Sequence, residues 1–240
     1  MGLNVALIGG GYWGSKIHQH LLRHPLVDDI SLITRSKGSL SHVLSDSTIT
    51  HILVATPVET HYTLVKQCLE AGKNVMCEKN FTPKYLETLG LVALAHERKL
   101  TLLVDFIYTF HPGLADLKAS GLSNFEIEIS QFGAFREETV LSMLGSHAIA
   151  LCYLLSDTVS IVDCRVRPDE VFVKFEGFSI FVSRQKGPEK VRIIRTPTQE
   201  FDLSYPNGID CMLDQFFAGK SNFKIIEGVG RTLEQISLLG

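Results

Sequence analysis

The sequence predicts a doubly wound α/β domain followed by a smaller α+β domain, and three observations support this fold class. In the first hundred residues, short apolar runs alternate with longer helical patterns. A glycine-rich turn directly follows the first apolar run. After residue 108, short strand-like runs follow one another without helices between most of them. We therefore expect two domains, residues 1–108 with a parallel sheet and residues 109–240 with a mainly antiparallel open sheet.

Five apolar runs of the first domain are expected to be strands, because continuous apolar residues are typical of a sheet covered by helices on both faces. These expected strands are residues 4–8, 30–34, 51–55, 74–77 and 100–105. The first helix between them shows apolar residues every four positions, at Trp13, Ile17 and Leu21. The expected helices are residues 13–24, 40–44, 63–71 and 84–99. Gly72 supplies a C-cap signal for the third.

The second domain is expected to contain a helix start at 112–117 and an apolar helix over 145–155. Its strand-like runs are residues 126–131, 160–167, 170–175, 178–183, 192–196 and 200–203. Turn residues separate several of these runs, so consecutive strands should pair antiparallel. The turns are Pro168-Asp169, Glu176-Gly177 and Lys186-Gly187-Pro188. Two helices, 209–218 and 230–238, are expected to close the chain.

Composition excludes several classes of protein. The 240 residues are 45% hydrophobic and 20% charged, which is typical of globular domains and not of disordered chains. The 23 Lys and Arg against 26 Asp and Glu give a net charge of -3, so we expect neither nucleic acid nor an anionic membrane as a partner. The uncharged segment 139–156 is expected to be a buried helix with its approach loop rather than a membrane span. Five scattered cysteines without a C-x-x-C pair indicate free thiols, no metal site and a cytoplasmic protein.

The glycine-rich turn fits the pattern G-x-G-x-x-G inside a βαβ unit. Gly9 permits the tight turn, Gly11 lets the backbone approach a pyrophosphate, and Gly14 lets the helix pack closely on the strand. The helix start at Tyr12 and Trp13 then presents N–H groups and a positive dipole end to the phosphates. We expect a dinucleotide site in a Rossmann domain. The alternative is a glycine turn that is merely tight.

The residues after the second strand indicate which dinucleotide is bound. An Asp or Glu at this place binds the adenosine ribose 2′-hydroxyl of NAD, but this chain has Thr34-Arg35-Ser36-Lys37. Two cations and two hydroxyls suit a 2′-phosphate, which favours NADP over NAD. The alternative is a solvated loop that happens to be basic.

Three further stretches resemble, in order and spacing, the Gfo/Idh/MocA family of NAD(P)-dependent oxidoreductases. They are Ala55-Thr56-Pro57 with His61 downstream, residues 71–79 (AGKNVMCEK), and Leu144-Gly145-Ser146-His147. The resemblance covers nearly the whole chain and is strongest over residues 4–82. It implies a C-terminal domain whose open sheet often forms a dimer interface, so a homodimer through that sheet is expected.

The resemblance also implies roles for single residues. Ala55, Thr56 and Pro57 would border the nicotinamide half of the cofactor. Glu78 and Lys79 match the family's Glu-Lys-Pro signature, in which the lysine contacts substrate and nicotinamide and acts as acid or base. Independently, a lysine at the carboxyl end of a parallel strand lies at the binding edge of the sheet. The alternative is a surface lysine that follows a strand.

His147 matches the family histidine that orients or protonates the substrate oxygen; the alternative is a satisfied histidine on a buried helix. Two positions depart from the family pattern. Asn80 replaces the proline after the lysine, and Met143 replaces the Asp that usually lies four residues before the histidine. Glu137 or Glu138 could substitute for that Asp. The chain is also shorter than many relatives, so its second domain must be trimmed.

These observations predict an oxidoreductase that transfers a hydride between a nicotinamide and a hydroxyl or carbonyl carbon. The expected substrate is a carbohydrate, most simply a sugar or sugar nucleotide, with Lys79 as principal acid/base and His147 as its partner. Two alternative functions are also consistent with the sequence. One is a cofactor-binding sensor or assembly protein without turnover, and the other is a reductase of a non-sugar substrate.

Overall fold

A computed structural model describes residues 2–122, 124–132, 139–185, 190–205 and 208–239. The chain divides into two compact units. The first comprises Met1–Asp105 with Ile209–Gly230, and the second comprises Phe106–Gly208 with Arg231–Gly240. The domain division at residue 108 stays a prediction.

The first unit contains a five-stranded sheet in the order β2-β1-β3-β4-β5, and every neighbouring pair is parallel. Its strands are β1 (Leu3–Ile8), β2 (Val27–Ile33), β3 (Ile49–Val54), β4 (Asn74–Glu78) and β5 (Leu102–Asp105). The prediction of a doubly wound parallel sheet is confirmed. The side chains of β1 and β3 from Val5 to Leu7 and from Ile52 to Val54 are at most 1% exposed, because helices cover both faces.

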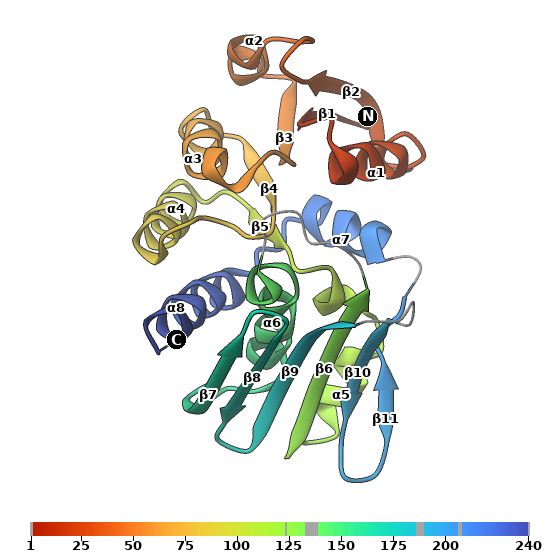
Figure 1. Ribbon diagram of the computed structural model, residues 1–240. Helices are drawn as coiled ribbons and strands as arrows, with labels where there is room; N and C mark the ends of the chain where they lie inside the picture. Colours follow the sequence, from red (N-terminus) through yellow and green to blue (C-terminus); the bar gives the residue numbers. More distant parts are fainter. Residues whose placement is uncertain (1, 123, 133–138, 186–189, 206–207, 240) are drawn as a thin grey trace. The chain divides into compact units, whose positions relative to one another are not determined.

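Figure 1 shows α2, α3 and α4 on one side of this sheet and α1 and α7 on the other. The helices are α1 (Tyr12–Leu21), α2 (Leu40–Ser45), α3 (His61–Glu70) after the short turn η1 (Val58–Thr60), α4 (Tyr85–Arg98), α7 (Gly208–Phe217) and α8 (Phe223–Leu239). Gly72, with φ of +75°, follows the C-cap of α3, as its C-cap signal indicated. The last helix begins seven residues before the expected position 230.

Strand β1 lies between β2 and β3, so the chain leaves β1 toward one side of the sheet and continues from β3 toward the other. Such a reversal of strand order is a topological switch point, where open α/β sheets bind their ligands at the carboxyl ends of the strands. The carboxyl ends of β1, β2 and β3 therefore frame the candidate site.

The second unit contains a six-stranded mixed sheet in the order β11-β10-β6-β9-β8-β7. Its strands are β6 (Phe125–Phe132), β7 (Ile161–Arg167), β8 (Glu170–Phe175), β9 (Phe178–Gln185), β10 (Val191–Arg195) and β11 (Glu200–Asp202). The sheet is mainly antiparallel, as predicted, but β9 and β10 do not pair with each other. Strand β6 lies between them, parallel to β9 and antiparallel to β10. The expected turn at 186–188 lies outside the described residues.

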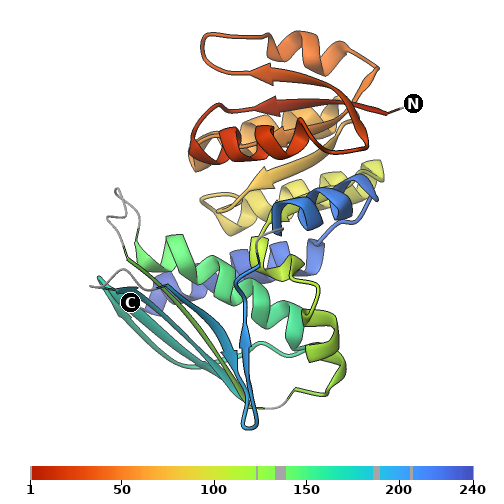
Figure 2. The same cartoon turned by 90° about the vertical axis from the view of Figure 1, so that its right-hand side faces the viewer.

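Helix α6 (Ser146–Leu155) packs on one face of this sheet, and in the described part of the chain no helix covers the other face (Figure 2). Every residue of α6 except Leu154 is buried, which fits the expected apolar helix. A π-helical turn, η3 (Leu141–Gly145), precedes it, and the unit also contains η2 (Ile107–Phe110), α5 (Leu114–Ala119) and the part of α8 from Arg231 onward. None of the described helices has the length and apolar character needed to cross a membrane.

Candidate functional site

The glycine turn between β1 and α1 places backbone where side chains cannot fit. Gly9 has φ of +117°, and a Cβ there would lie 2.1 Å from the carbonyl oxygen of Ala55. A Cβ at Gly14 would lie 2.2 Å from the carbonyl oxygen of Gly9. Both distances are far below van der Waals contact, so the two glycines are required for the turn and for the close packing of α1 on β1.

Gly11 is different because a side chain there would meet open space. Its φ of -72° suits any residue, and outside α1's own backbone and the chain neighbours no described atom lies within 4 Å of the added Cβ. Gly11 is the N-cap of α1 and has no side chain to cap the first-turn N–H groups. This open helix N-terminus fits the diphosphate of a dinucleotide.

The loop after β2 borders the glycine turn. A Cβ at Gly10 would lie 3.0 Å from Cγ2 of Thr34, so the two loops are in contact. The N–H of Thr34 donates to the carbonyl oxygen of Lys37 at 2.8 Å, which folds the loop back on itself. Arg35, Ser36 and Lys37 are exposed, and the loop carries no carboxylate. Its charge and hydroxyls fit a 2′-phosphate.

The loop after β3 is joined to the loop after β4 by His61. This histidine is 1% exposed. Its Nε2 lies 2.8 Å from the carbonyl oxygen of Thr56, and its Nδ1 lies 2.9 Å from that of Asn80 and 3.1 Å from that of Phe81. Because carbonyl oxygens only accept hydrogen bonds, the ring donates from whichever nitrogen carries a proton. His61 therefore holds Ala55-Thr56-Pro57 beside the residue that follows Lys79.

Lys79 directly follows β4 and is half-buried, and its peptide bond to Asn80 is cis. The preceding Glu78 is buried and lies opposite the buried Asp105 of β5. Burial, with the negative charges of both carboxylates as smaller causes, raises the pKa of the Cys77 thiol well above its usual value. Cys77 is therefore an inert core thiol, and the role expected of Lys79 at this strand end stays a prediction.

His147 lies in the second unit, at the second position of α6, and is buried. The ring of Tyr108 packs edge-on against it, with centroids 5.0 Å apart. Met143 belongs to the π-helical turn η3, so this turn lacks the family's Asp. Glu137 and Glu138, the possible substitutes, lie outside the described residues.

The structure brings the expected cofactor-binding residues to one edge of the first sheet, whereas His147 belongs to the other unit. The residues at that edge are Gly9, Gly11, Tyr12, Trp13, Gly14, Thr34, Arg35, Ser36, Ala55, Thr56, Pro57, Glu78 and Lys79. The sequence analysis missed one polar group, Tyr108, Gln131 and Arg192, which lies near His147. Strand alternation in β10 could have indicated Arg192, because it puts this charged residue on the same face as the buried Ile194. In the described ranges no three His, Cys, Asp or Glu side chains are placed to hold a metal ion.

Comparison with known proteins agrees with this geometry. Residues 23–106 match the family described as "Oxidoreductase family, NAD-binding Rossmann fold". This match places residues 23–106 in the Gfo/Idh/MocA oxidoreductase family. NAD or NADP binding is typical of this family.

Two curated relatives match parts of the chain. An uncharacterized oxidoreductase of Schizosaccharomyces pombe is 36% identical over 106 residues, which is 41% of this chain and 28% of the relative. Inositol 2-dehydrogenase 4 of Saccharopolyspora erythraea is 30% identical over 135 residues, which is 48% of this chain and 40% of the relative. The chain thus matches less than half the length of either relative.

A solved structure shares the fold over both units of the chain. The UDP-N-acetylglucosamine 3-dehydrogenase GnnA from Acidithiobacillus ferrooxidans superposes with a TM-score of 0.83 at 19% identity, covering 99% of this chain and 97% of the GnnA chain. At this identity the likeness establishes the architecture alone.

Proposed function

We propose that this chain is an NADP-preferring oxidoreductase that transfers a hydride between the nicotinamide and a hydroxyl or carbonyl carbon of a sugar or sugar nucleotide. The observation that carries the proposal is the glycine turn, closed to side chains at Gly9 and Gly14 and open at Gly11. A turn that only had to be tight would not need glycine at position 11, since the backbone there suits any residue. The names of GnnA and of the inositol dehydrogenase support a polyhydroxylated substrate.

In this proposal the protein's own residues position the reactants and move the proton. Amides at the start of α1 hold the diphosphate, and Arg35 with Ser36 holds the 2′-phosphate. Lys79 exchanges a proton with the substrate oxygen through Nζ, and His147 orients that oxygen through a ring nitrogen. When bound, the nicotinamide supplies the hydride chemistry, which no side chain can perform.

Gly11→Asp tests the nucleotide site and separates binding from folding. Asp is a favourable N-cap, so the variant should be as stable as the wild type or slightly more stable. The same carboxylate would occupy the open space and repel a diphosphate, so the Kd for NADPH should rise at least about 100-fold. Cofactor fluorescence gives the Kd, and thermal melting followed by circular dichroism gives the stability.

The matched control is Ser45→Asp, which adds the same charge to the exposed end of α2, before the amino end of β3. It should leave NADPH affinity unchanged. Wild-type protein that binds neither NADPH nor NADH would overturn the proposed function, and so would a folded Gly11→Asp variant with unchanged affinity.

Cofactor preference is tested at Arg35. Charge-assisted hydrogen bonds to phosphate contribute about 1.5–3 kcal/mol, so Arg35→Ala should weaken NADPH about 10- to 100-fold and NADH by less than about twofold. Thr34→Asp should shift preference toward NADH, because a carboxylate accepts from the ribose 2′-hydroxyl and repels a 2′-phosphate. An unchanged NADPH/NADH ratio in both variants would refute the NADP preference.

A second candidate function is cofactor binding without turnover, which Met143 favours because a thioether cannot relay a proton. Lys79→Met separates the two. For an enzyme, this change should abolish the oxidation of a substrate found by screening sugars and sugar nucleotides, whereas NADPH should still bind through the glycine turn, more weakly by the loss of the Lys79 contact. A protein that binds NADPH tightly but turns over no member of the screen would support the second candidate.

We also propose that the chain forms a homodimer through the face of the second sheet that carries no described helix. Two phenylalanines lie side by side on that face, since Phe172 of β8 pairs with Phe181 of β9. Both are only half-buried in the single chain. A self-complementary interface would cover them.

A further inference from the structure

Arg192 lies on the helix-covered face of the second sheet, where few charged side chains are placed. Strand alternation puts it on the same face as Ile194, which is fully buried. Its Nη2 donates to Oε1 of Gln131 at 3.3 Å, and its Nε is buried with no hydrogen-bond partner among the described residues. A half-buried guanidinium with a neutral partner retains a positive charge that the sheet does not compensate.

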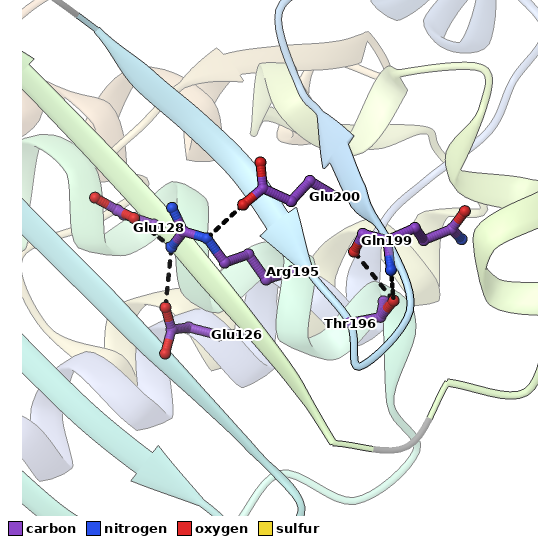
Figure 3. Close-up of polar contacts among 6 residues, drawn as sticks. All are labelled: Glu126, Glu128, Arg195, Thr196, Gln199 and Glu200. Atoms are coloured by element: carbon purple, nitrogen blue, oxygen red, sulfur yellow. Dashed lines mark hydrogen bonds and ion pairs between the residues drawn. The ribbon is translucent and has the colours of Figure 1, made fainter.

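The two neighbouring arginines are compensated by carboxylates. Arg195, three residues later on the opposite face, bonds to Glu126, Glu128 and Glu200 (Figure 3). These carboxylates raise the pKa of its guanidinium. Arg184 of β9 forms an ion pair with Asp169 at 3.4 Å. Among the described residues, Arg195 and Arg184 thus have carboxylate partners, whereas Arg192 bonds to the neutral Gln131.

One carboxylate does affect Arg192. The pKa of Asp202 is lowered mainly by hydrogen bonds from Ser204, and the charges of His111 and Arg192 contribute less. The N–H of Ser204 donates to Oδ1 of Asp202 at 2.8 Å, so this exposed carboxylate is directed at its own turn. Asp202 is thus a distant counter-charge and not a hydrogen-bonded partner of the guanidinium.

Arg192 also lies beside the histidine that the proposed function assigns to the substrate oxygen. Its guanidinium carbon is 5.6 Å from the centroid of the Tyr108 ring, and that ring packs against His147 at 5.0 Å. All three residues belong to the second unit. An anion bound by Arg192 would therefore lie beside the Tyr108 ring that packs against His147.

We propose that Arg192, with Gln131, binds an anionic oxygen group of the substrate and determines its specificity. The substrate class is then an acidic carbohydrate, carrying a carboxylate or a phosphate, and not a neutral sugar. A planar guanidinium suits both groups, because its N–H donors match two oxygens at once. This inference rests on the proposed function, since it takes His147 as the residue beside the substrate oxygen.

The test uses the full chain saturated with NADPH and four probes, D-glucose, D-glucuronate, D-glucose 6-phosphate and UDP-N-acetylglucosamine. Binding of each is measured by calorimetry. At least one of the three anionic probes should bind about tenfold or more tighter than D-glucose. Comparison of D-glucuronate, D-glucose 6-phosphate and UDP-N-acetylglucosamine distinguishes a carboxylate, a monophosphate and a nucleotide diphosphate as the anion.

Arg192→Gln should weaken the preferred anionic probe about 10- to 100-fold and leave D-glucose unchanged. Arg192→Lys keeps the charge without the planar fork and should recover part of the affinity. Arg195→Gln is the matched control from the same strand, and it should leave probe binding unchanged even where it lowers the melting temperature. For a probe that is also turned over, the Arg192→Gln effect should appear mainly in KM.

Two results would overturn the inference while NADPH binding stays intact. One is a wild-type protein that binds D-glucose as tightly as every anionic probe. The other is an Arg192→Gln variant that is folded, by its melting temperature, and binds the preferred anion as wild type does. Failure of NADPH binding itself would instead remove the proposed function, so the two failures are distinguishable.

Discussion

His61 shows how one buried side chain can fix the geometry of two loops. Its ring nitrogens face the carbonyl oxygens of Thr56, Asn80 and Phe81. His61→Phe keeps an aromatic ring, though a larger one, and removes every ring N–H, so buried carbonyl groups lose a donor. We expect the free energy of unfolding to fall by about 1–3 kcal/mol, measured by urea denaturation. The exposed His42→Phe serves as control and should change it by less than about 0.5 kcal/mol.

His51 gives the stability a defined pH dependence. Burial lowers its pKa from the usual value of about 6.5, and the rings of Phe216 and Phe217 pack against it. The folded chain therefore binds fewer protons than the unfolded chain as the pH falls through 6.5, so the free energy of unfolding decreases toward acid. His51→Gln should flatten the fall in that free energy between about pH 7.5 and about pH 5.5. An equally steep fall in the variant would assign the effect to other groups.

Strand β5 is an edge strand whose backbone groups are bonded by side chains from a distant segment. Oδ1 of Asn222 accepts from the N–H of Val104 at 3.0 Å, and its Nδ2 donates to the carbonyl oxygen of Val104 at 2.9 Å. Oγ of Ser221 accepts from the N–H of Leu102 at 3.1 Å. Segment 221–222 thus takes the place of a sixth strand and protects the edge from pairing with another chain.

Asn222→Ala should therefore open the β5 edge without disturbing the other strands. The Val104 amide loses its acceptor, and its hydrogen exchange should accelerate at least about tenfold, whereas that of Leu53 in central β3 should change little. Hydrogen exchange followed by mass spectrometry or NMR measures both amides. Equal acceleration at Val104 and Leu53 would mean global destabilisation and not a local role for Asn222.

The elements differ in how much the sequence determines them. Parallel strands of continuous apolar residues, such as 51–55, were predictable because burial on both faces leaves a strong local signal. The place of β6 between β9 and β10 was not predictable, because pairing between strands that are distant in the sequence depends on the whole sheet. The start of α8 was missed because Gly228 weakens the helical pattern of residues 223–229, although Asn222 before them is a favourable N-cap residue. The role proposed for Arg192 could be inferred only from its neighbours, since among the described residues carboxylates bond to Arg195 and the neutral Gln131 bonds to Arg192.

At the scale of the molecule, the uncovered face of the second sheet carries an ordered row of side chains. Two phenylalanines lie near its middle, with a basic end on β7 and an acidic end on β11. The row, in strand-pair register, is Arg165, Phe172, Phe181, Glu128, Ile193 and Asp202. A two-fold axis along the strands would place the basic end of one copy on the acidic end of the other.

Phe181→Glu tests this arrangement, because it puts a charge in the centre of the row beside Glu128. Wild-type protein should sediment at about twice the 26.7 kDa chain mass, and the variant at about the single-chain mass. The control, Leu22→Glu, makes the same kind of change at a side chain that is 67% exposed in the first unit and should stay dimeric. The complementary change Arg165→Glu should weaken the dimer less, because only charge at the rim is lost. A wild-type protein that sediments as a monomer at micromolar concentration would refute the dimer and leave the nucleotide site untouched.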